Sequence, residues 1–554
     1  IKMSQCCKIM VTMILPDNFI FFAMKFILFM AFFFFIGRGF LILFSKIIEI
    51  DNLKVAGLNV YIFYPVLGVI LFGNYLFLLN FFLPLNTLLI FLILLMLIPN
   101  LQSVPSYKLL KKSFRNFFLY LLLLIPSYDL SYHYDAGLYH LNYQALLRES
   151  NIMLGISNIY GPYGIGSIYD YISAALWFDV SFVLLQFVNL LFIILFYELL
   201  TNILFTRKNK LLNHAGLALL LFSILDNFGY GGGRNGFLYI QSLGKQDIAL
   251  AVLYFVTVVL IFLSISKKEF THIEILIPTI FSLFIIQLKV SGVTIVLFYL
   301  FYLYKVIQNK GLKSASLFSI LSATLLGILW SLKSLLQTGC LIYPLEISCI
   351  DNISWLNREY TKVTLESAQA FSISYDFNSS FVRWIERFVD YEINQIILSN
   401  FLISLVVIYF VFFKQKTFNF SSPISPIISL SMFNIFFFLY YGPHLRYLIA
   451  TQLLFVFLIG YSRTPRIPLH SRTIYIAVIF SLVSLVRLNS YKSFDAFSHP
   501  RHDIPVPELA SYNNRFIPKE GDQCWSVSEC SPNLQSYKIE KFGFFQKVSL
   551  ETPK

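Results

Sequence analysis

Long runs of apolar residues recur along almost the whole chain, and they restrict it to a membrane fold. Clear examples are residues 19–44, 88–98 with their flanks, and 180–204. A helix needs about 20 apolar residues to cross a bilayer core. Hydrophobic residues make up 57% of the 554 positions and charged residues only 13%, whereas a soluble domain carries about 25% charged residues. The sequence therefore predicts an all-α, multi-pass membrane protein and excludes a soluble one.

The net charge of +13 is compatible with nucleic-acid binding, but its distribution is not. Lysines and arginines gather in short, acid-poor segments between the apolar runs: 108–115, 207–210, 267–268, 305–313, 414–416 and 463–472. Cytoplasmic loops of membrane proteins show this pattern under the positive-inside rule. We therefore read the charge as a topology signal and expect no nucleic-acid partner.

Placing the basic segments in the cytoplasm gives about 14 spans, with both termini outside. The predicted spans lie near 19–44, 58–79, 84–100, 116–127, 180–205, 213–226, 247–266, 273–288, 290–305, 314–332, 395–413, 424–441, 446–462 and 473–488. The first run is too long for the core of a cleavable signal, so we expect it to remain as a span.

This topology divides the chain into three parts. Residues 1–115 form N-terminal membrane helices, 116–488 a transmembrane core and 489–554 an extracytoplasmic tail. The long polar loops of the core are 128–178, 227–246 and 333–392. All three fall on the outer face, where we expect the function.

Four of the six cysteines form two close pairs on the predicted outer side, Cys340 with Cys349 and Cys524 with Cys530. Disulfides persist in oxidising compartments, so we predict both bonds. Free thiols and a metal site are the alternatives, although neither pair has the further His or Cys that a four-ligand site needs. The second bond would staple an ordered but irregular tail.

A short polar island lies between two apolar runs, at residues 128–142. It holds two carboxylates, two histidines and four tyrosines: Asp129, Asp135, His133, His140, Tyr128, Tyr132, Tyr134 and Tyr139. Ionisable groups at the end of a membrane helix cost several kcal/mol unless they line a wet, functional cavity. Asp135 lies within reach of Tyr139 and His140 along the sequence. The island therefore predicts chemistry on a lipid-linked substrate, with Asp135 as its centre.

Further candidates stand at span ends on the same side. Asp247 opens a span, where it either caps the helix, a contribution of about 0.3–1 kcal/mol, or acts as a second functional carboxylate. Lys289 and Arg446 stand at span ends, where they either extend to lipid headgroups or bind a phosphate, to which arginine can donate two hydrogen bonds. His444 and Tyr447 share the very short turn of Arg446.

Four weaker signals fall in the outer loops. The glycine-rich segment 158–166 either holds a phosphate or sugar hydroxyl or is only a tight loop, and the segment 227–235 carries Arg234. Lys333 follows Trp330 and either contacts substrate or marks a helix exit with an interfacial anchor. Residues 143–150 predict an amphipathic helix that lies in the membrane interface.

Together these residues resemble the GT-C superfamily of polyprenyl-phosphate-sugar-dependent glycosyltransferases. Asp135, in Tyr134-Asp-Ala-Gly-Leu-Tyr-His140, matches the acidic motif that follows a membrane helix in that superfamily, and Asp247 matches a second acidic residue. Arg446-Tyr447 resembles the late motif that contacts the lipid phosphate. Within the superfamily, the same string, the corner Gly339–Pro344 and the tail Cys524-Trp525…Cys530 resemble a little-characterised group of bacterial envelope proteins.

The resemblance implies a GT-C-like core with outer interfacial helices in the bacterial inner membrane, its active face extracytoplasmic. It implies transfer of a sugar from a polyprenyl-phosphate donor to a glycan, lipid or protein acceptor. Asp135, Asp247 and His140 would be catalytic. The substrate-binding residues would be Tyr139, Asp129, His133, Arg234, Lys289, Lys333, His444, Arg446 and Tyr447. No certain cofactor is implied; a divalent cation is the one candidate.

The chain departs from the superfamily in two ways. Three spans precede the helix of the acidic loop, and the motif has a single Asp135 in place of a paired Asp-Glu unless Asp129 contributes.

Other functions remain open. A transporter or flippase of lipid-linked oligosaccharide would place ionisable groups near the bilayer midplane, where Glu198, Asp226 and Lys25 are the few candidates. A polysaccharide polymerase or ligase, or an inactive scaffold, would share the outer site.

Overall fold

The computed structural model contains the whole chain, and most of it can be described. Isolated positions apart, the described residues are 18–45, 53–103, 120–128, 132–177, 183–206, 210–228, 246–265, 270–309, 314–369, 381–412, 424–441, 445–462, 471–484, 504–512, 515–532 and 537–550. Three candidate residues, Asp129, Arg234 and His444, lie outside this set.

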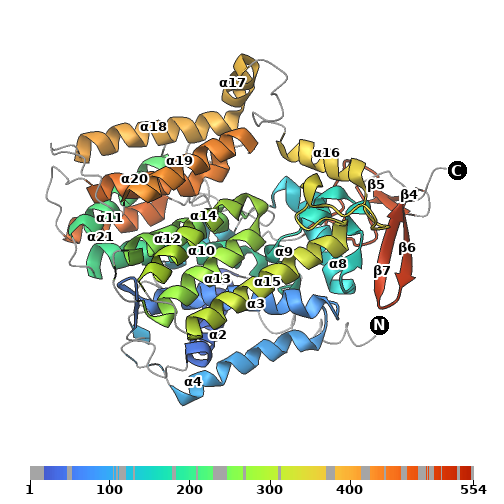
Figure 1. Cartoon of the computed structure of the whole chain (residues 1–554), viewed down its shortest axis with the longest axis horizontal. Coiled ribbons are helices and arrows are strands. Elements are labelled where there is room, and N and C mark those ends of the chain that lie inside the picture. The colour runs from blue at the N-terminus through green and yellow to red at the C-terminus, as the bar shows by residue number, and fades with distance from the viewer. Residues whose placement is uncertain are drawn as a thin grey trace.

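Helices make up most of the described chain. The longer ones are α2 (Phe19–Ser45), α3 (Tyr64–Asn80), α10 (Leu184–Thr206), α11 (Lys210–Phe228), α12 (Asp247–Ile265), α13 (His272–Leu288), α14 (Ile295–Gln308), α15 (Ser314–Thr338), α18 (Glu392–Phe412), α19 (Ile424–Tyr441), α20 (Ile449–Ser462) and α21 (Ser471–Ser484). Many of them run side by side along the length of the molecule (Figure 1). The chain is thus mainly helical, as predicted.

Within the described residues, nine helical segments are long and apolar enough to cross a membrane. They are Phe19–Phe44, Val60–Asn80, Leu184–Phe205, Asp247–Ile265, Val290–Gln308, Ser316–Thr338, Glu392–Val411, Ile424–Tyr441 and Leu445–Ser462. Two shorter apolar helices, Leu88–Gln102 and His272–Leu288, coincide with further predicted spans. A membrane protein is therefore supported, and the total of about 14 spans stays a prediction.

The crossing of α2 and α3 shows how these helices pack. A Cβ atom on Gly37 would lie 1.9 Å from the carbonyl oxygen of Tyr64, and one on Gly68 would lie 2.1 Å from that of Phe33. Only glycine fits at either position, so the two backbones touch. Small residues at such crossings are the usual means of close packing between membrane helices.

Short elements gather at one end of the molecule, at the right of Figure 1. They include α8 (Leu141–Glu149), α9 (Ile168–Ala175) and α16 (Arg358–Gln369), while α17 (Phe381–Asp390) projects beside the start of α18. Residues 143–149 lie in helix α8, as predicted, but the expectation that its Leu and Tyr side chains enter the lipid is wrong. Tyr143, Gln144, Leu146 and Leu147 are all buried within the protein, because other segments of the same end cover both faces of α8.

The C-terminal tail is not irregular, contrary to the prediction. Strands β4 (Leu509–Tyr512) and β5 (Arg515–Pro518) form one antiparallel pair, and β6 (Tyr537–Phe542) and β7 (Phe545–Leu550) another. Gly543, at φ +61°, lies in the second turn, a conformation that suits glycine. Polar and apolar residues alternate along β6, a pattern of strands that the sequence reading overlooked.

The tail is attached to the polar loop that follows the island. Strand β7 pairs in parallel with β3 (Met153–Leu154), and Asn142 donates to the carbonyl oxygen of Cys530 (3.2 Å). Both predicted cysteine pairs, Cys340–Cys349 and Cys524–Cys530, are disulfides in the structure. The end of the chain is thereby held against residues that lie almost 400 positions earlier.

Candidate functional site

The described part of the polar island ends in an unusual turn. Residues Ala136–His140 form a π-helical turn that leads into α8, with Asp135 at its N-cap. Single π turns of this kind are rare and often lie at functional sites. The Asp135 carboxylate is about one-quarter exposed and lies 3.4 Å from Nδ1 of His133. It is therefore a partly exposed carboxylate at the edge of a packed turn.

A second group, here named the Asp247 cluster, consists of Asp247, Lys289, Arg446 and Tyr447. Asp247 is the first residue of α12, Lys289 follows α13, and the other two lie in the turn η10 (Leu445–Leu448) before α20. Asn394 of α18 accepts a hydrogen bond from the backbone N–H of Leu445 (2.9 Å) and so fixes this turn. Ends of separate helices thus place four side chains together that are up to 200 residues apart.

The Asp247 carboxylate is shared by two cations. Its Oδ1 accepts a hydrogen bond from Lys289 Nζ (2.8 Å), and its Oδ2 lies 3.6 Å from Arg446 Nε. Lys289 Nζ also lies 4.4 Å from the ring centroid of Tyr447, a cation–π distance. Arg446 donates to the hydroxyl of Tyr447 (3.4 Å). Among the side chains that the structure describes here, one carboxylate therefore faces two cations.

Burial makes this imbalance costly. The side chain of Asp247 is 3% exposed, that of Lys289 29% and that of Arg446 22%. Arg446 Nε is buried and has no hydrogen-bond partner. Burial lowers the pKa of Lys289, but the attraction of Asp247, with Tyr447, outweighs it and raises the pKa overall. Lysine therefore stays charged, and an added anion would balance the cluster.

Little free space adjoins the buried side of the cluster. The cavity bounded there by Asp247, Tyr254, Asn434 and Arg446 has a volume of about 10 Å³, which is room for about one water molecule. A ligand would therefore meet Lys289 and Arg446 at their exposed parts.

Tyr139 links the island to the Asp247 cluster. Its pKa is raised well above the usual value, first by burial and then by the charges of Asp135 and Asp170, with smaller contributions from Tyr447 and Asp247. Its phenol therefore stays neutral and lies within electrostatic range of both candidate carboxylates. Asp135 and Asp247, predicted to act together, thus both raise the pKa of the same phenol.

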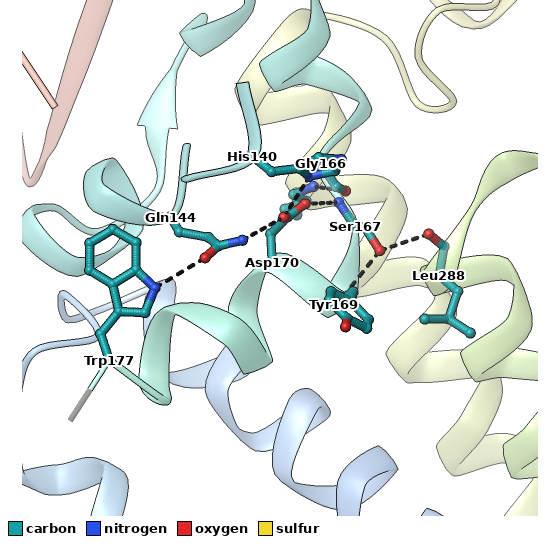
Figure 2. Close-up of polar contacts among 9 residues, drawn as sticks. His140, Gln144, Gly166, Ser167, Tyr169, Asp170, Trp177 and Leu288 are labelled. Atoms are coloured by element: carbon teal, nitrogen blue, oxygen red, sulfur yellow. Dashed lines mark hydrogen bonds and ion pairs between the residues drawn. The ribbon is translucent and has the colours of Figure 1, made fainter. Parts of the chain in front are cut away.

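Sequence reasoning missed a buried carboxylate, Asp170, in the first turn of α9. Its Oδ1 lies 2.8 Å from Nδ1 of His140 and accepts from Gln144 (3.1 Å), while its Oδ2 accepts from the N–H of Ser167 (3.2 Å). Figure 2 shows these contacts converging on Asp170, with Trp177 donating in turn to Gln144 (3.1 Å). The spacing Ser167-x-x-Asp170 is a capping box, and this pattern is recognisable in a sequence.

His140 thus has a defined structural partner. Asp170 holds one ring nitrogen, and both side chains are buried. An Asp–His pair orients the imidazole, as in many catalytic sites, but here the pair lies in the packed interior beside α9. The position of His140 therefore suits a structural role, in which it holds the π turn and so fixes the position of Tyr139.

Lys333 is also engaged within the protein. It is buried, donates to the carbonyl oxygen of Gly166 (3.0 Å) and lies 4.4 Å from the ring centroid of Trp330. The glycine-rich segment beside it is closely packed: a Cβ atom on Gly161 would lie 2.4 Å from Thr364 Oγ1. This geometry matches the tight loop and the anchored helix exit better than a ligand site.

No three His, Cys, Asp or Glu side chains come together to hold a metal ion within the part of the chain that the structure describes. The Asp247 carboxylate already faces two cations, which disfavours a further cation there.

Comparison with known proteins gives a family but no activity. Residues 19–453 match the model of a family described as "Domain of unknown function (DUF8201)". The chain belongs to this family. The match covers the described island, α9 and the whole Asp247 cluster, and it ends before the C-terminal tail. No curated protein matches the chain, and no solved structure does.

Proposed function

We propose that this member of the DUF8201 family is a membrane glycosyltransferase. It would transfer a sugar from a polyprenyl-phosphate donor to an envelope polysaccharide, lipid or protein acceptor on the extracytoplasmic face of a bacterial inner membrane. The observation that carries the proposal is the Asp247 cluster, in which Lys289 and Arg446 share one carboxylate. Their excess positive charge suits a phosphate at the membrane surface.

The cluster would act on the leaving group. When the bond between the anomeric carbon and the phosphate oxygen breaks, the oxygen keeps the electron pair and negative charge grows on the lipid phosphate. Fixed cations stabilise such developing charge. Arg446 can offer two N–H groups in one plane, a geometry that matches phosphate oxygens. Lys289 adds a point charge beside it.

Asp135 would act on the acceptor. An acceptor hydroxyl must lose its proton as its oxygen bonds to the anomeric carbon, and a carboxylate can take that proton. Asp135 is partly exposed, so it can reach a substrate. A single displacement that inverts the anomeric centre needs one such base, and Tyr139 lies within electrostatic range of both parts of the site.

A transporter of lipid-linked sugars is the second candidate. Glu198 lies buried within α10 and accepts a hydrogen bond from the Tyr120 hydroxyl (2.6 Å), and transporters hold ionisable groups inside the bilayer. The transferase is favoured because the charges of the Asp247 cluster gather at helix ends instead. A polymerase or ligase of lipid-linked glycans would use the same phosphate site.

The substitution Asp135→Asn tests the proposal. The amide keeps the shape of the side chain but cannot take a proton, so we expect the turnover of radiolabelled polyprenyl-phosphate hexoses to fall by about 10²–10⁴-fold. Thermal stability of the purified protein should be unchanged. Asp351→Asn, which alters an exposed carboxylate paired with Arg358, is the matched control. Full activity in Asp135→Asn would contradict the role of the base, and lipid movement without sugar transfer would favour the transporter.

A further inference from the structure

A cleft outside the Asp247 cluster lies between the island and the C-terminal tail. It has a volume of about 490 Å³ and is lined by Tyr134 on one side and by the tail residues Glu508, Glu520, Asp522, Gln523 and Trp525 on the other. This volume falls in the range of small-molecule sites, about 300–1,000 Å³. Apart from Tyr134, these lining residues belong to the C-terminal tail. The family match ends at residue 453 and does not include this tail.

The two walls of the cleft are joined by direct contacts. The Tyr134 hydroxyl donates to Asp522, and Gln523 donates to the carbonyl oxygen of Tyr134 (3.1 Å). The N–H of Trp525 donates to the carbonyl oxygen of Gly137 (2.9 Å). A Cβ atom on Gly137 would lie 2.9 Å from the Trp525 ring, so this glycine allows the tail to dock. The cleft is therefore a fixed part of the fold.

The lining combines two groups that recognise sugars. The aromatic rings of Tyr134 and Trp525 present flat apolar surfaces with a polar edge, against which the C–H faces of a sugar ring can stack. The carboxylates of Glu508, Glu520 and Asp522 can accept hydrogen bonds from neighbouring hydroxyl groups. The two rings would thus supply stacking surfaces, and the carboxylates would fix the orientation of the bound ligand.

The charge of the lining narrows the ligand class. Three carboxylates line the cleft, and Lys519 forms an ion pair with one of them, Glu508 (3.2 Å). The hydrogen bond to Asp522 raises the pKa of Tyr134 to about 12, so the phenol stays neutral and the three carboxylates carry the negative charge of the lining. A ligand with carboxylate, sulfate or phosphate groups would meet repulsion here, whereas neutral sugars and amino sugars would not.

The cleft also opens beside the proposed base, because Tyr134 is the chain neighbour of Asp135. We infer that this cleft binds the glycan acceptor and that it selects glycans without acidic groups. That the bound glycan is an acceptor rests on the proposed transferase function. Glycan binding itself needs no donor and no catalysis. The acidic residues of the tail would thus determine which class of glycan binds.

Equilibrium binding tests this assignment in the detergent-purified full-length protein. The probes are N,N′,N″,N‴-tetraacetylchitotetraose, cellotetraose and tetragalacturonate, which have equal ring number and differ in charge. We expect at least one neutral tetrasaccharide to bind, and tetragalacturonate to bind about tenfold more weakly or not at all, because like charges repel at these distances. Added salt should narrow the difference.

Substitutions in the cleft sharpen the test. Trp525→Ala should weaken neutral-glycan binding by about tenfold or more, as loss of a buried aromatic contact commonly does. Trp525→Phe should retain most of it. Glu520→Gln should keep neutral binding and improve tetragalacturonate binding by about threefold to fivefold. Glu529→Gln changes an exposed carboxylate of the same tail that does not line the cleft, and it should alter neither affinity.

The outcomes separate the cleft from the transferase. Arg446→Ala should bind the tetrasaccharides normally, because it alters only the Asp247 cluster. Glycan binding without transfer from any donor would leave the cleft standing and refute the proposed function. If both Trp525→Ala and Trp525→Phe transfer sugar with an unchanged acceptor KM, the cleft is not the acceptor site. Preference for tetragalacturonate, or no binding of either neutral probe to the folded wild-type protein, would also overturn it.

Discussion

Asp170 and Asp247 are two buried carboxylates in the first turns of helices, and they are surrounded in opposite ways. Asp170 faces Gln144, the backbone N–H of Ser167 and His140, so its oxygens are satisfied by groups of its own neighbourhood. Asp247 faces Lys289 and Arg446 and leaves positive charge in excess. The first arrangement is complete without a ligand, whereas the second gains from one.

The contrast separates a structural carboxylate from a functional one. Buried polar groups with all partners present rigidify a fold, and Asp170 does this between α8 and α9. A buried cation that lacks a full counter-charge is unfavourable unless something else supplies it. Burial alone therefore does not identify the site; the balance of charge around each carboxylate does.

The largest expected effect is on stability, in Asp170→Ala. The substitution leaves buried donors on Gln144, Ser167 and His140 without an acceptor, and each such group costs about 1–3 kcal/mol. We expect a loss of about 3–5 kcal/mol in the free energy of unfolding, measured by denaturation in a fixed detergent. Asp390→Ala, at the exposed end of α17, should change the free energy of unfolding by less than about 0.5 kcal/mol. Equal stability of the two variants would break the contrast.

A ligand should rescue one carboxylate variant and not the other. Asp247→Asn leaves Lys289 and Arg446 without a counter-charge, so we expect lower thermal stability that farnesyl phosphate restores. Saturation at about 100 times Kd stabilises a protein by about 2.7 kcal/mol. Farnesol, which lacks the phosphate, is the matched probe and should give no shift. Rescue of Asp170→Ala by the same phosphate would show that the two sites are not distinct.

Arginine geometry should matter at the Asp247 cluster. We expect Arg446→Ala to weaken farnesyl phosphate binding by about 10–100-fold, because loss of one partner of a close charge pair commonly costs 2 kcal/mol or more. Arg446→Lys should recover part of it, since lysine keeps the charge but not the planar fork. Lys305→Ala, at the other end of α14 from this site, is the control. An unchanged Kd in Arg446→Ala would remove the phosphate role.

The smallest effect concerns pH. The pKa of Lys289 is raised in the folded protein above its unfolded value of 10.5. Its contribution to stability is therefore fully present below pH 10.5 and is lost as the pH rises through the folded pKa. Thermal stability of the wild type should fall more steeply above pH 10.5 than that of Lys289→Met. Parallel curves for the two proteins would contradict the ion pair with Asp247.

Part of the site could be predicted because some signals are local. Asp135, Lys289 and Arg446 stand out in sequence as ionisable residues beside apolar runs, where burial without a purpose is unfavourable. Asp170 does not stand out in this way, because it is one acid in a polar loop and only its capping box marks it. The strands β6 and β7 were overlooked because a short alternating segment between prolines and cysteines resembles a loop.

Sequence by itself determined that this chain is a helical membrane protein, because apolar length and the distribution of charge act locally and additively. It also indicated the two disulfides, since each pair closes a short loop. Tertiary structure alone decided which charges meet. The partnership of Asp247 with Lys289 and Arg446, of His140 with Asp170, and of Tyr134 with the tail depends on how helix ends and strands pack, and such contacts span up to nearly 400 residues of chain. No local pattern encodes pairings over that distance.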